Sequence, residues 1–284
     1  MPPHLSLSML VDNHTLTDRY FCGEPGLSFF IETGGKKILF DTGYSGVFLA
    51  NAEKMGISLR ELDVLVLSHG HLDHSGGLVP LVRYLNEATI ERVAHKVPEV
   101  VAHPRCFFPK EKILLKNNGS ILGEAEVRRE FPVNLSARPV RLTKDLIFLG
   151  EIPRRFAFEE TDPGKRIIHL PDGRTEPDQM LDDSALAFGS PEGLVIITGC
   201  SHAGICNITE YAREICGERR VVAIIGGLHL LQSLPGQMDE TCSYLRALSL
   251  EALYACHCTS LSSKITLAGA CPIREVGVGL SLSW

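Results

Sequence analysis

Four potential metal ligands lie within six residues in the stretch LSHGHLDHSGG at 67–77. His69, His71, Asp73 and His74 form an H-x-H-x-D-H array. Side chains two residues apart on an extended segment point to the same side, so His69 and His71 can bind one ion together. Asp73 and His74 lie at the following turn and can face a second ion. Imidazole nitrogens with one carboxylate suit zinc, and also iron or manganese, and such a set usually leaves a position open for water.

The residues on both sides of this array predict the elements that carry it. The largely apolar run 63–67 is typical of a buried strand, and a helical pattern at 78–85 follows Ser75-Gly76-Gly77. The array therefore lies on a loop between a strand and a helix. Other apolar runs and helical patterns alternate along the chain, which indicates a layered α and β architecture. The other predicted strands are 5–11, 221–225 and 253–258, the hairpins are 26–40 and 183–198, and the other helices are 47–55, 205–216 and 238–248.

Three later strands also end near residues that can bind a metal. Cys200 and His202 follow the strand at 194–198, and strand ends feed the edge where the first ligands lie, so His202 is a candidate ligand. Cys200 is either a ligand or a small buried hydrophobe. His229 follows the strand at 221–225 and either lines the site or is a core histidine bonded to backbone. In Cys256-His257-Cys258 the two cysteines point away from the histidine if the segment is extended, which argues against a zinc finger.

The composition limits the class of protein and its partners. An apolar fraction of 44% and a charged fraction of 22% are typical of a soluble globular protein. A net charge of -6 argues against a nucleic-acid binder, because affinity for phosphate backbones comes largely from clustered Lys and Arg. The nine cysteines include no C-x-x-C pair and are expected to be reduced and mostly buried. With no signal-like N-terminus and no apolar run of ~18 residues, we expect a cytoplasmic protein without a membrane partner.

Basic residues gather in the middle of the chain, where the periodicity is weak. Residues 105–174 hold 14 of the 28 Lys and Arg, together with ten acidic residues. One interpretation is a solvated surface of mixed charge. The other is a lid whose arginines, above all Arg154 and Arg155, bind a small anionic substrate, because guanidinium groups match phosphate oxygens. We therefore expect one domain over residues 1–284, with an elaborated lid or insertion at about 103–180.

The H-x-H-x-D-H array on a loop after a core strand resembles the signature of the metallo-β-lactamase superfamily. The resemblance implies an α+β fold, a four-layer αββα sandwich of two mixed sheets flanked by helices, with a site for one or two divalent ions at one edge. Zinc is the expected metal, with iron and manganese as alternatives. The implied ligands of one ion are His69, His71 and His202, or Cys200 in place of His202, and those of the second are Asp73, His74 and His257.

The resemblance also assigns roles to residues outside the array. Asp41, at the end of a strand in Phe-Asp-Thr-Gly, corresponds to a carboxylate that orients the metal-binding loop, although Asp-Thr-Gly is also a common turn sequence. Most superfamily members carry an Asp that bridges two metals where this chain has Cys200. Asp183 lies where many relatives carry a histidine, so it is a possible oxygen ligand.

Several loop motifs are similar to a narrower branch of the superfamily. They include His-Gly-His-x-Asp-His-Ser-Gly-Gly, Gly-Glu-Ile-Pro-Arg, Thr-Gly-Cys-Ser-His-Ala-Gly-Ile, Gly-Gly-Leu-His-Leu and Cys-His-Cys-Thr. This combination resembles the dihydropteroate-synthase-like branch, which includes the archaeal dihydropterin-ribofuranosylaminobenzene-phosphate synthases. Members of that kind join a pterin-methyl diphosphate to an arylamine and release diphosphate.

Three functions follow as hypotheses. In the first, the protein is a metal-dependent hydrolase in which activated water attacks a phosphate ester or a related anionic substrate, with Asp73 and His202 as catalytic residues. In the second, the same site serves a transferase that condenses a pterin-methyl diphosphate with an arylamine. In the third, the protein is a metal or ligand sensor without catalysis.

Overall fold

Two mixed β-sheets pack face to face in the computed structural model, which describes residues 4–160, 166–231 and 236–284. Within these residues the first sheet has seven strands in the order β16-β1-β2-β3-β4-β5-β7. Its strands are antiparallel from β16 to β3 and parallel from β3 to β7. They are β1 (Leu5–Val11), β2 (Ser28–Thr33), β3 (Lys36–Phe40), β4 (Val64–Val66), β5 (Glu99–Ala102), β7 (Val133–Leu135) and β16 (Ser281–Ser283).

The second sheet repeats this arrangement. In the described part of the chain it has six strands in the order β15-β14-β13-β12-β9-β8, antiparallel from β8 to β13 and parallel from β13 to β15. Each sheet thus combines a hairpin with parallel strands. The strands are β8 (Val140–Arg141), β9 (Leu146–Phe148), β12 (Ala185–Ser190), β13 (Gly193–Thr198), β14 (Val221–Gly227) and β15 (Ala252–Cys256).

The main core lies between the two sheets. Phe29 and Phe40 of the first sheet stack with ring centroids 6.3 Å apart, and they share one buried cluster with Phe148 and Phe188 of the second. These side chains are fully buried. Removing such a side chain from water stabilises the fold by roughly 1.5–3 kcal/mol, so this layer holds the two sheets together.

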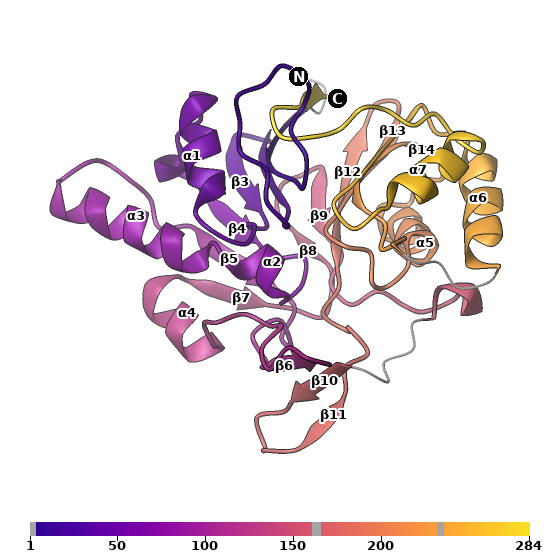
Figure 1. Cartoon of the computed structure of the whole chain (residues 1–284). Helices are drawn as coiled ribbons and strands as arrows, with labels where there is room; N and C mark the ends of the chain where they lie inside the picture. The colour runs from indigo at the N-terminus through magenta and orange to yellow at the C-terminus, as the bar shows by residue number, and fades with distance from the viewer. Residues whose placement is uncertain (1–3, 161–165, 232–235) are drawn as a thin grey trace.

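Helices cover the outer face of each sheet, as Figure 1 shows. Leu78, Leu81 and Leu85 pack against the first sheet, and Ile205, Ile208 and Ala212 against the second. The result is the predicted four-layer αββα sandwich. No helix in the described ranges is both long and apolar enough to cross a membrane. The covering helices are α1 (Val47–Lys54), α3 (Leu78–Ile90) and α4 (Glu124–Glu130) on one side, and α5 (Ile205–Cys216), α6 (Gln237–Leu248) and α7 (Leu261–Ala268) on the other.

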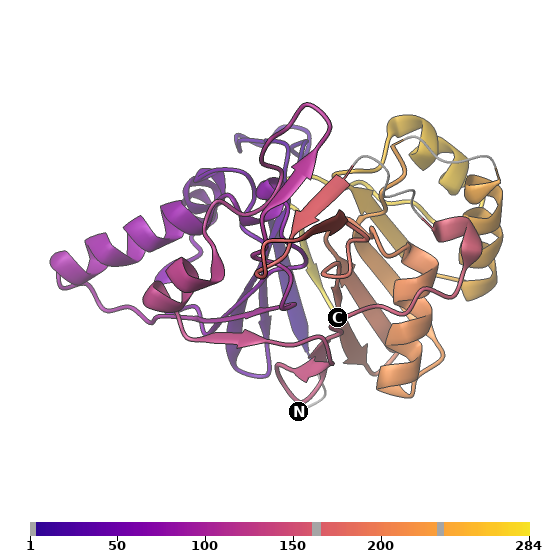
Figure 2. The same cartoon turned by 90° about the horizontal axis from the view of Figure 1, so that it is seen from below.

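The middle segment, expected to be a lid or insertion at about 103–180, is divided in the structure. Its strands β7, β8 and β9 belong to the two main sheets. The rest carries β6 (Lys110–Lys112), β10 (Arg166–His169) and β11 (Thr175–Pro177), which form a separate sheet in the order β11-β10-β6, called the small sheet below. Figure 2 shows the small sheet across the end of the sandwich where the two halves meet. Residues 161–165 lie outside the described residues.

Candidate metal centre

The array and the distal candidates meet at one edge of the sandwich, where strands of both sheets end. The loop after β4 carries His69 and His71 and leads into the short helix α2 (Leu72–Ser75). Cys200, His229 and His257 follow the parallel strands β13, β14 and β15. His229 and His257 have positive φ angles of 52° and 49°. Such a backbone costs roughly 1–3 kcal/mol at a non-glycine residue and is often found at functional sites.

The first donor group consists of three histidines. His69 Nε2 lies 3.0 Å from His71 Nδ1, and His202 Nε2 lies 3.2 Å from the same atom. All three side chains are buried, and their donor atoms lie within 4.8 Å of one another. Their geometry therefore allows three nitrogen donors to bind one ion.

The second donor group combines two histidines with a carboxylate. His74 Nε2 and His257 Nε2 lie 3.2 Å apart. Asp73 Oδ2 lies 3.4 Å from His257 Nε2 and 4.0 Å from His74 Nε2. The Asp73 side chain keeps 35% of its surface exposed, so this group faces solvent.

Cys200 lies between the two donor groups. Its Sγ is 3.2 Å from His74 Nε2, and it forms possible ligand sets with His69 and His74 and with His202 and His229. Burial raises the pKa of the Cys200 thiol well above its ordinary value. A thiol must lose its proton to bind a metal, so an ion at this position would have to overcome that cost.

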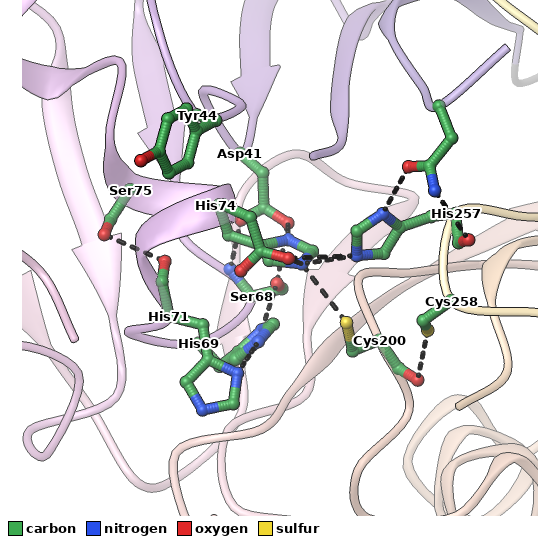
Figure 3. A network of polar contacts seen from close by, with 12 residues as sticks. Asp41, Tyr44, Ser68, His69, His71, His74, Ser75, Cys200, His257 and Cys258 are labelled. Atoms are coloured by element: carbon green, nitrogen blue, oxygen red, sulfur yellow. Dashed lines mark hydrogen bonds and ion pairs between the residues drawn. The ribbon is translucent and has the colours of Figure 1, made fainter. Parts of the chain in front are cut away.

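Asp41 orients the array, as Figure 3 shows. Its carboxylate accepts hydrogen bonds from Ser68 N at 2.7 Å and from Ser68 Oγ at 2.6 Å, and it lies 2.7 Å from His74 Nδ1. The Ser68 hydroxyl lies 2.9 Å from His69 Nδ1. The Nδ1 atoms of His69 and His74 therefore have hydrogen-bond partners on the side away from the site, which leaves both Nε2 atoms facing the site.

Two residues that the sequence reading missed hold His257. Asp12 Oδ1 accepts the backbone N–H of His257 at 2.8 Å. Asn13 Oδ1 lies 3.2 Å from His257 Nδ1, and Asn13 Nδ2 donates to the His257 carbonyl at 3.3 Å. Asp12 and Asn13 follow β1, far from His257 in the chain, and in the sequence they resemble any polar turn. No local signal predicts this contact.

Asp182 and Asp183 support the ligand loops. Asp182 Oδ2 accepts the N–H of Gly70 at 2.8 Å, and Asp182 Oδ1 lies 2.5 Å from Lys110 Nζ. Asp183 Oδ2 accepts the N–H of Ala203 at 2.8 Å. Among the described residues, Asp183 is in no donor group, although it was a possible metal ligand in the sequence. Because its carboxylate bonds to Ala203, the residue after His202, Asp183 helps to fix the loop that carries His202.

The electrostatics favour the protonation states that metal binding requires at His69, His71, His202 and Asp73, but not at His74. Burial lowers the pKa of His71 to about 3 and holds the pKa of His69 and of His202 well below the ordinary value, so these imidazoles are neutral. Burial opposes the charge of Asp73, but His74 and His257 lower the pKa of this carboxyl and keep it ionised. For His74, burial is outweighed by Asp41 and Asp73, which raise its pKa to about 9, so an ion that binds this imidazole would have to displace a proton.

One sequence expectation about the surroundings of the site is corrected by the structure. Cys258 was expected to point away from His257, but the positive φ of His257 ends the extended segment. As a result Cys258 Sγ lies beside Cys200, within 3.4 Å of its carbonyl oxygen.

The two arginines expected to bind substrate are engaged elsewhere. Arg154 donates to the carbonyl of His202 at 2.7 Å and to that of Met180 at 3.0 Å, which fixes the His202 loop. Arg155 forms an ion pair with Glu214 on α5. Neither guanidinium lines the cavity at the donor groups.

A cavity of about 250 Å³ opens over both donor groups. A larger one of about 550 Å³ lies beside α1, but no histidine or cysteine lines it, so chemistry rather than size identifies the site. The residues around the smaller cavity include cationic side chains as well as candidate metal ligands. They are Asn13, Pro25, His71, Asp73, Lys112, Asn118, Arg166, Cys200, His202, His229, Leu231, His257 and Cys258.

This fold and this array define a class of protein, and the sequence comparison agrees. The chain belongs to the metallo-β-lactamase superfamily, whose profile matches residues 23–206. It is 31% identical over 275 residues to the 7,8-dihydropterin-6-methyl-4-(β-D-ribofuranosyl)-aminobenzene-5′-phosphate synthase of Methanocaldococcus jannaschii, an alignment that covers 89% of this chain and 90% of that protein.

Solved structures show the same fold. The crystal structure of Tm1679, a metal-dependent hydrolase of the β-lactamase superfamily, matches with a TM-score of 0.81 and 27% identity over 98% of both chains. A diphosphatase from the PhnP family matches with a TM-score of 0.55 and 17% identity, over 100% of this chain and 98% of that one.

Proposed function

We propose that this protein is a metal-dependent hydrolase in which water attacks a phosphate ester or a related anionic substrate. The observation that carries the proposal is the convergence of two donor groups, one of three histidines and one of two histidines and Asp73, beneath one open cavity. His71 Nε2 is buried without a partner among the described groups, whereas His71 Nδ1 faces the other two histidines. This donor chemistry fits divalent ions such as zinc.

Each donor group would hold one ion. His69, His71 and His202 supply neutral nitrogens, while Asp73, His74 and His257 add the negative charge of one carboxylate. Cys200 lies where it can contribute to either ion or to both. Bound divalent ions lower the pKa of water toward neutrality and neutralise charge that develops in the transition state.

The chain's own residues would position the attack. The ionised Asp73 carboxylate is on the solvent-facing side of the second group, where it can accept a hydrogen bond from the attacking water and orient its lone pair. His202 closes the opposite side of the first group, and Arg154 and Asp183 fix its loop. A fixed ligand geometry keeps the reacting atoms aligned, which lowers the entropic part of the barrier.

A transferase is the second candidate, and one finding favours it. The relative that is 31% identical over most of both chains is named as a synthase. In this alternative the same ions would bind the leaving diphosphate, and an arylamine rather than water would attack a pterin-methyl carbon.

The two candidates are separated by phosphorus NMR of the zinc-loaded protein with phosphomonoesters, phosphodiesters and a pterin-methyl diphosphate, each with and without an arylamine. Hydrolysis predicts a phosphorus product that forms at the same rate without the amine and is lost after chelation. Diphosphate release that requires the amine would replace the hydrolase by the transferase. Metal binding without any product would favour a sensor.

A further inference from the structure

Two cations of the small sheet line the same cavity as the donor groups. Lys112 of β6 and Arg166 of β10 are directly paired across the antiparallel ladder. Both line the cavity together with His71, Asp73 and His202. Like charges opposite each other on neighbouring strands destabilise a sheet. A pair of this kind at the rim of a cavity therefore favours an anion bound between the two side chains.

A neighbouring lysine shows the contrast. Lys110, on the same strand as Lys112, is buried and lies between Asp178 and Asp182. Its charge is compensated within the protein. Within residues 4–160, 166–231 and 236–284, neither Lys112 nor Arg166 forms such an ion pair. Among the described groups, the two positive charges thus line the cavity without an acidic partner.

The contact between Arg166 and His202 places the guanidinium beside the first donor group. Arg166 Nη1 lies 3.5 Å from His202 Nδ1, while His202 Nε2 faces His71. A neutral imidazole that binds an ion through Nε2 keeps its proton on Nδ1. Because His202 Nδ1 then carries a proton, it cannot accept a hydrogen bond from Arg166, whose guanidinium group only donates. When His202 binds an ion, the donors of Arg166 are therefore free to bind oxygen atoms in the cavity.

We propose that Lys112 and Arg166 form an anion subsite that binds a terminal phosphoryl group of the substrate next to the metal centre. This inference rests on the proposed function and narrows its substrate class. A terminal phosphoryl group carries close to two negative charges at neutral pH and three acceptor oxygens, which suit a guanidinium fork and an ammonium together. Diesters and uncharged esters gain less from the pair, so the subsite selects against them.

The test measures binding of inorganic diphosphate to the zinc-loaded protein by calorimetry. Lys112→Met and Arg166→Met should each weaken binding about tenfold or more, the loss expected for a charge-assisted hydrogen bond, and the double variant should weaken it further. Arg166→Lys should keep part of the affinity, because it retains the charge but not the fork. The zinc content of each variant should stay within about twofold of wild type, because neither side chain is in either donor group.

Lys116→Met and Arg174→Met are matched controls, because they remove the same charges from exposed positions near the small sheet that do not line the cavity. Both should bind diphosphate like wild type. The subsite is overturned if wild type does not bind diphosphate, or if the double variant with its full zinc content binds it equally well. If the variants lose diphosphate affinity while wild type hydrolyses no phosphorus substrate, the proposed function fails and the subsite stands.

Discussion

At the scale of single residues, hydrogen bonds on the far side of the His69 and His74 imidazoles determine which nitrogen faces the site. His69 and His74 direct Nε2 into the site because Ser68 and Asp41 engage their Nδ1 atoms. His71 is reversed, with Nδ1 in the site and a buried, unpartnered Nε2. The orientation of the His69 and His74 donor atoms therefore depends on two buried residues, Asp41 and Ser68, that are outside the donor groups.

The ligands themselves give the first prediction. Asp73→Ala and His71→Ala should each lower turnover of the best phosphorus substrate at least about a hundredfold, because each removes a donor from one group. His95→Ala changes a half-buried histidine that is in neither donor group and should leave turnover unchanged. Initial rates at saturating zinc, with circular dichroism to verify folding, measure the effect. Turnover like wild type in either ligand variant would exclude this site.

Asp41 gives a second prediction at this scale. Asp41→Asn keeps the size of the side chain but removes the negative charge that orients His74, so zinc affinity should fall about 10–100-fold. Competition with a chromophoric chelator measures the affinity. Asp172→Asn, at an exposed position outside the site, serves as the control. Equal affinities for the Asp41 variant and wild type would mean that the carboxylate only shapes a turn.

At the scale of elements, close approach of loops fixes the array. A Cβ on Gly70 would lie 1.9 Å from the carbonyl oxygen of Cys106. Gly70→Ala must therefore displace the loop between His69 and His71, and we expect a lower melting temperature and loss of zinc. Gly46→Ala is the control, because its Cβ would meet Pro80 at an ordinary 3.5 Å. Differential scanning calorimetry measures both variants, and equal melting temperatures would contradict this account.

The buried ion pair between β6 and the loop before β12 gives a prediction on stability. Lys110→Met leaves Asp182 and Asp178 buried without their cation, which should cost roughly 3–5 kcal/mol at neutral pH. Lys96→Met breaks an exposed pair with Asp63 and should cost at most about 1 kcal/mol. Urea unfolding measures both losses.

The pH dependence of that loss has a defined sign. Burial opposes the charge of Asp182, but Lys110 lowers the pKa of this carboxyl below its ordinary value. A depressed folded-state pKa stabilises the fold above the ordinary carboxyl pKa, and that contribution is lost as the pH falls. The difference between wild type and Lys110→Met should therefore shrink in acid. A difference that stays constant down to acid pH would contradict the role of this ion pair.

At the scale of the whole molecule, the sequence predicted what local patterns encode. The alternation of apolar runs and helical spacing predicted a layered α and β architecture, and the resemblance of the array to a known superfamily implied the αββα sandwich. Helix α5 coincides with the predicted 205–216. The array His69 to His74 was recognised because all its members lie within one loop.

Contacts between distant segments were not predictable in the same way. Asp12 reaches His257 across 245 positions of the chain, and Cys258 enters the site because one residue takes a positive φ. The arginines singled out by their motif, Arg154 and Arg155, bind backbone and Glu214 instead. The cations that line the cavity, Lys112 and Arg166, are opposed only once the small sheet has formed.

The most direct test of the central claim follows the oxygen of water. The zinc-loaded protein is incubated with a phosphomonoester or diphosphate substrate in heavy-oxygen water without any amine, and the phosphorus product is analysed by mass spectrometry. A hydrolase predicts one solvent oxygen incorporated into phosphorus product for each phosphate bond cleaved, and no product after chelation of the metal. Unlabelled diphosphate that forms only when an arylamine is added would contradict the hydrolase.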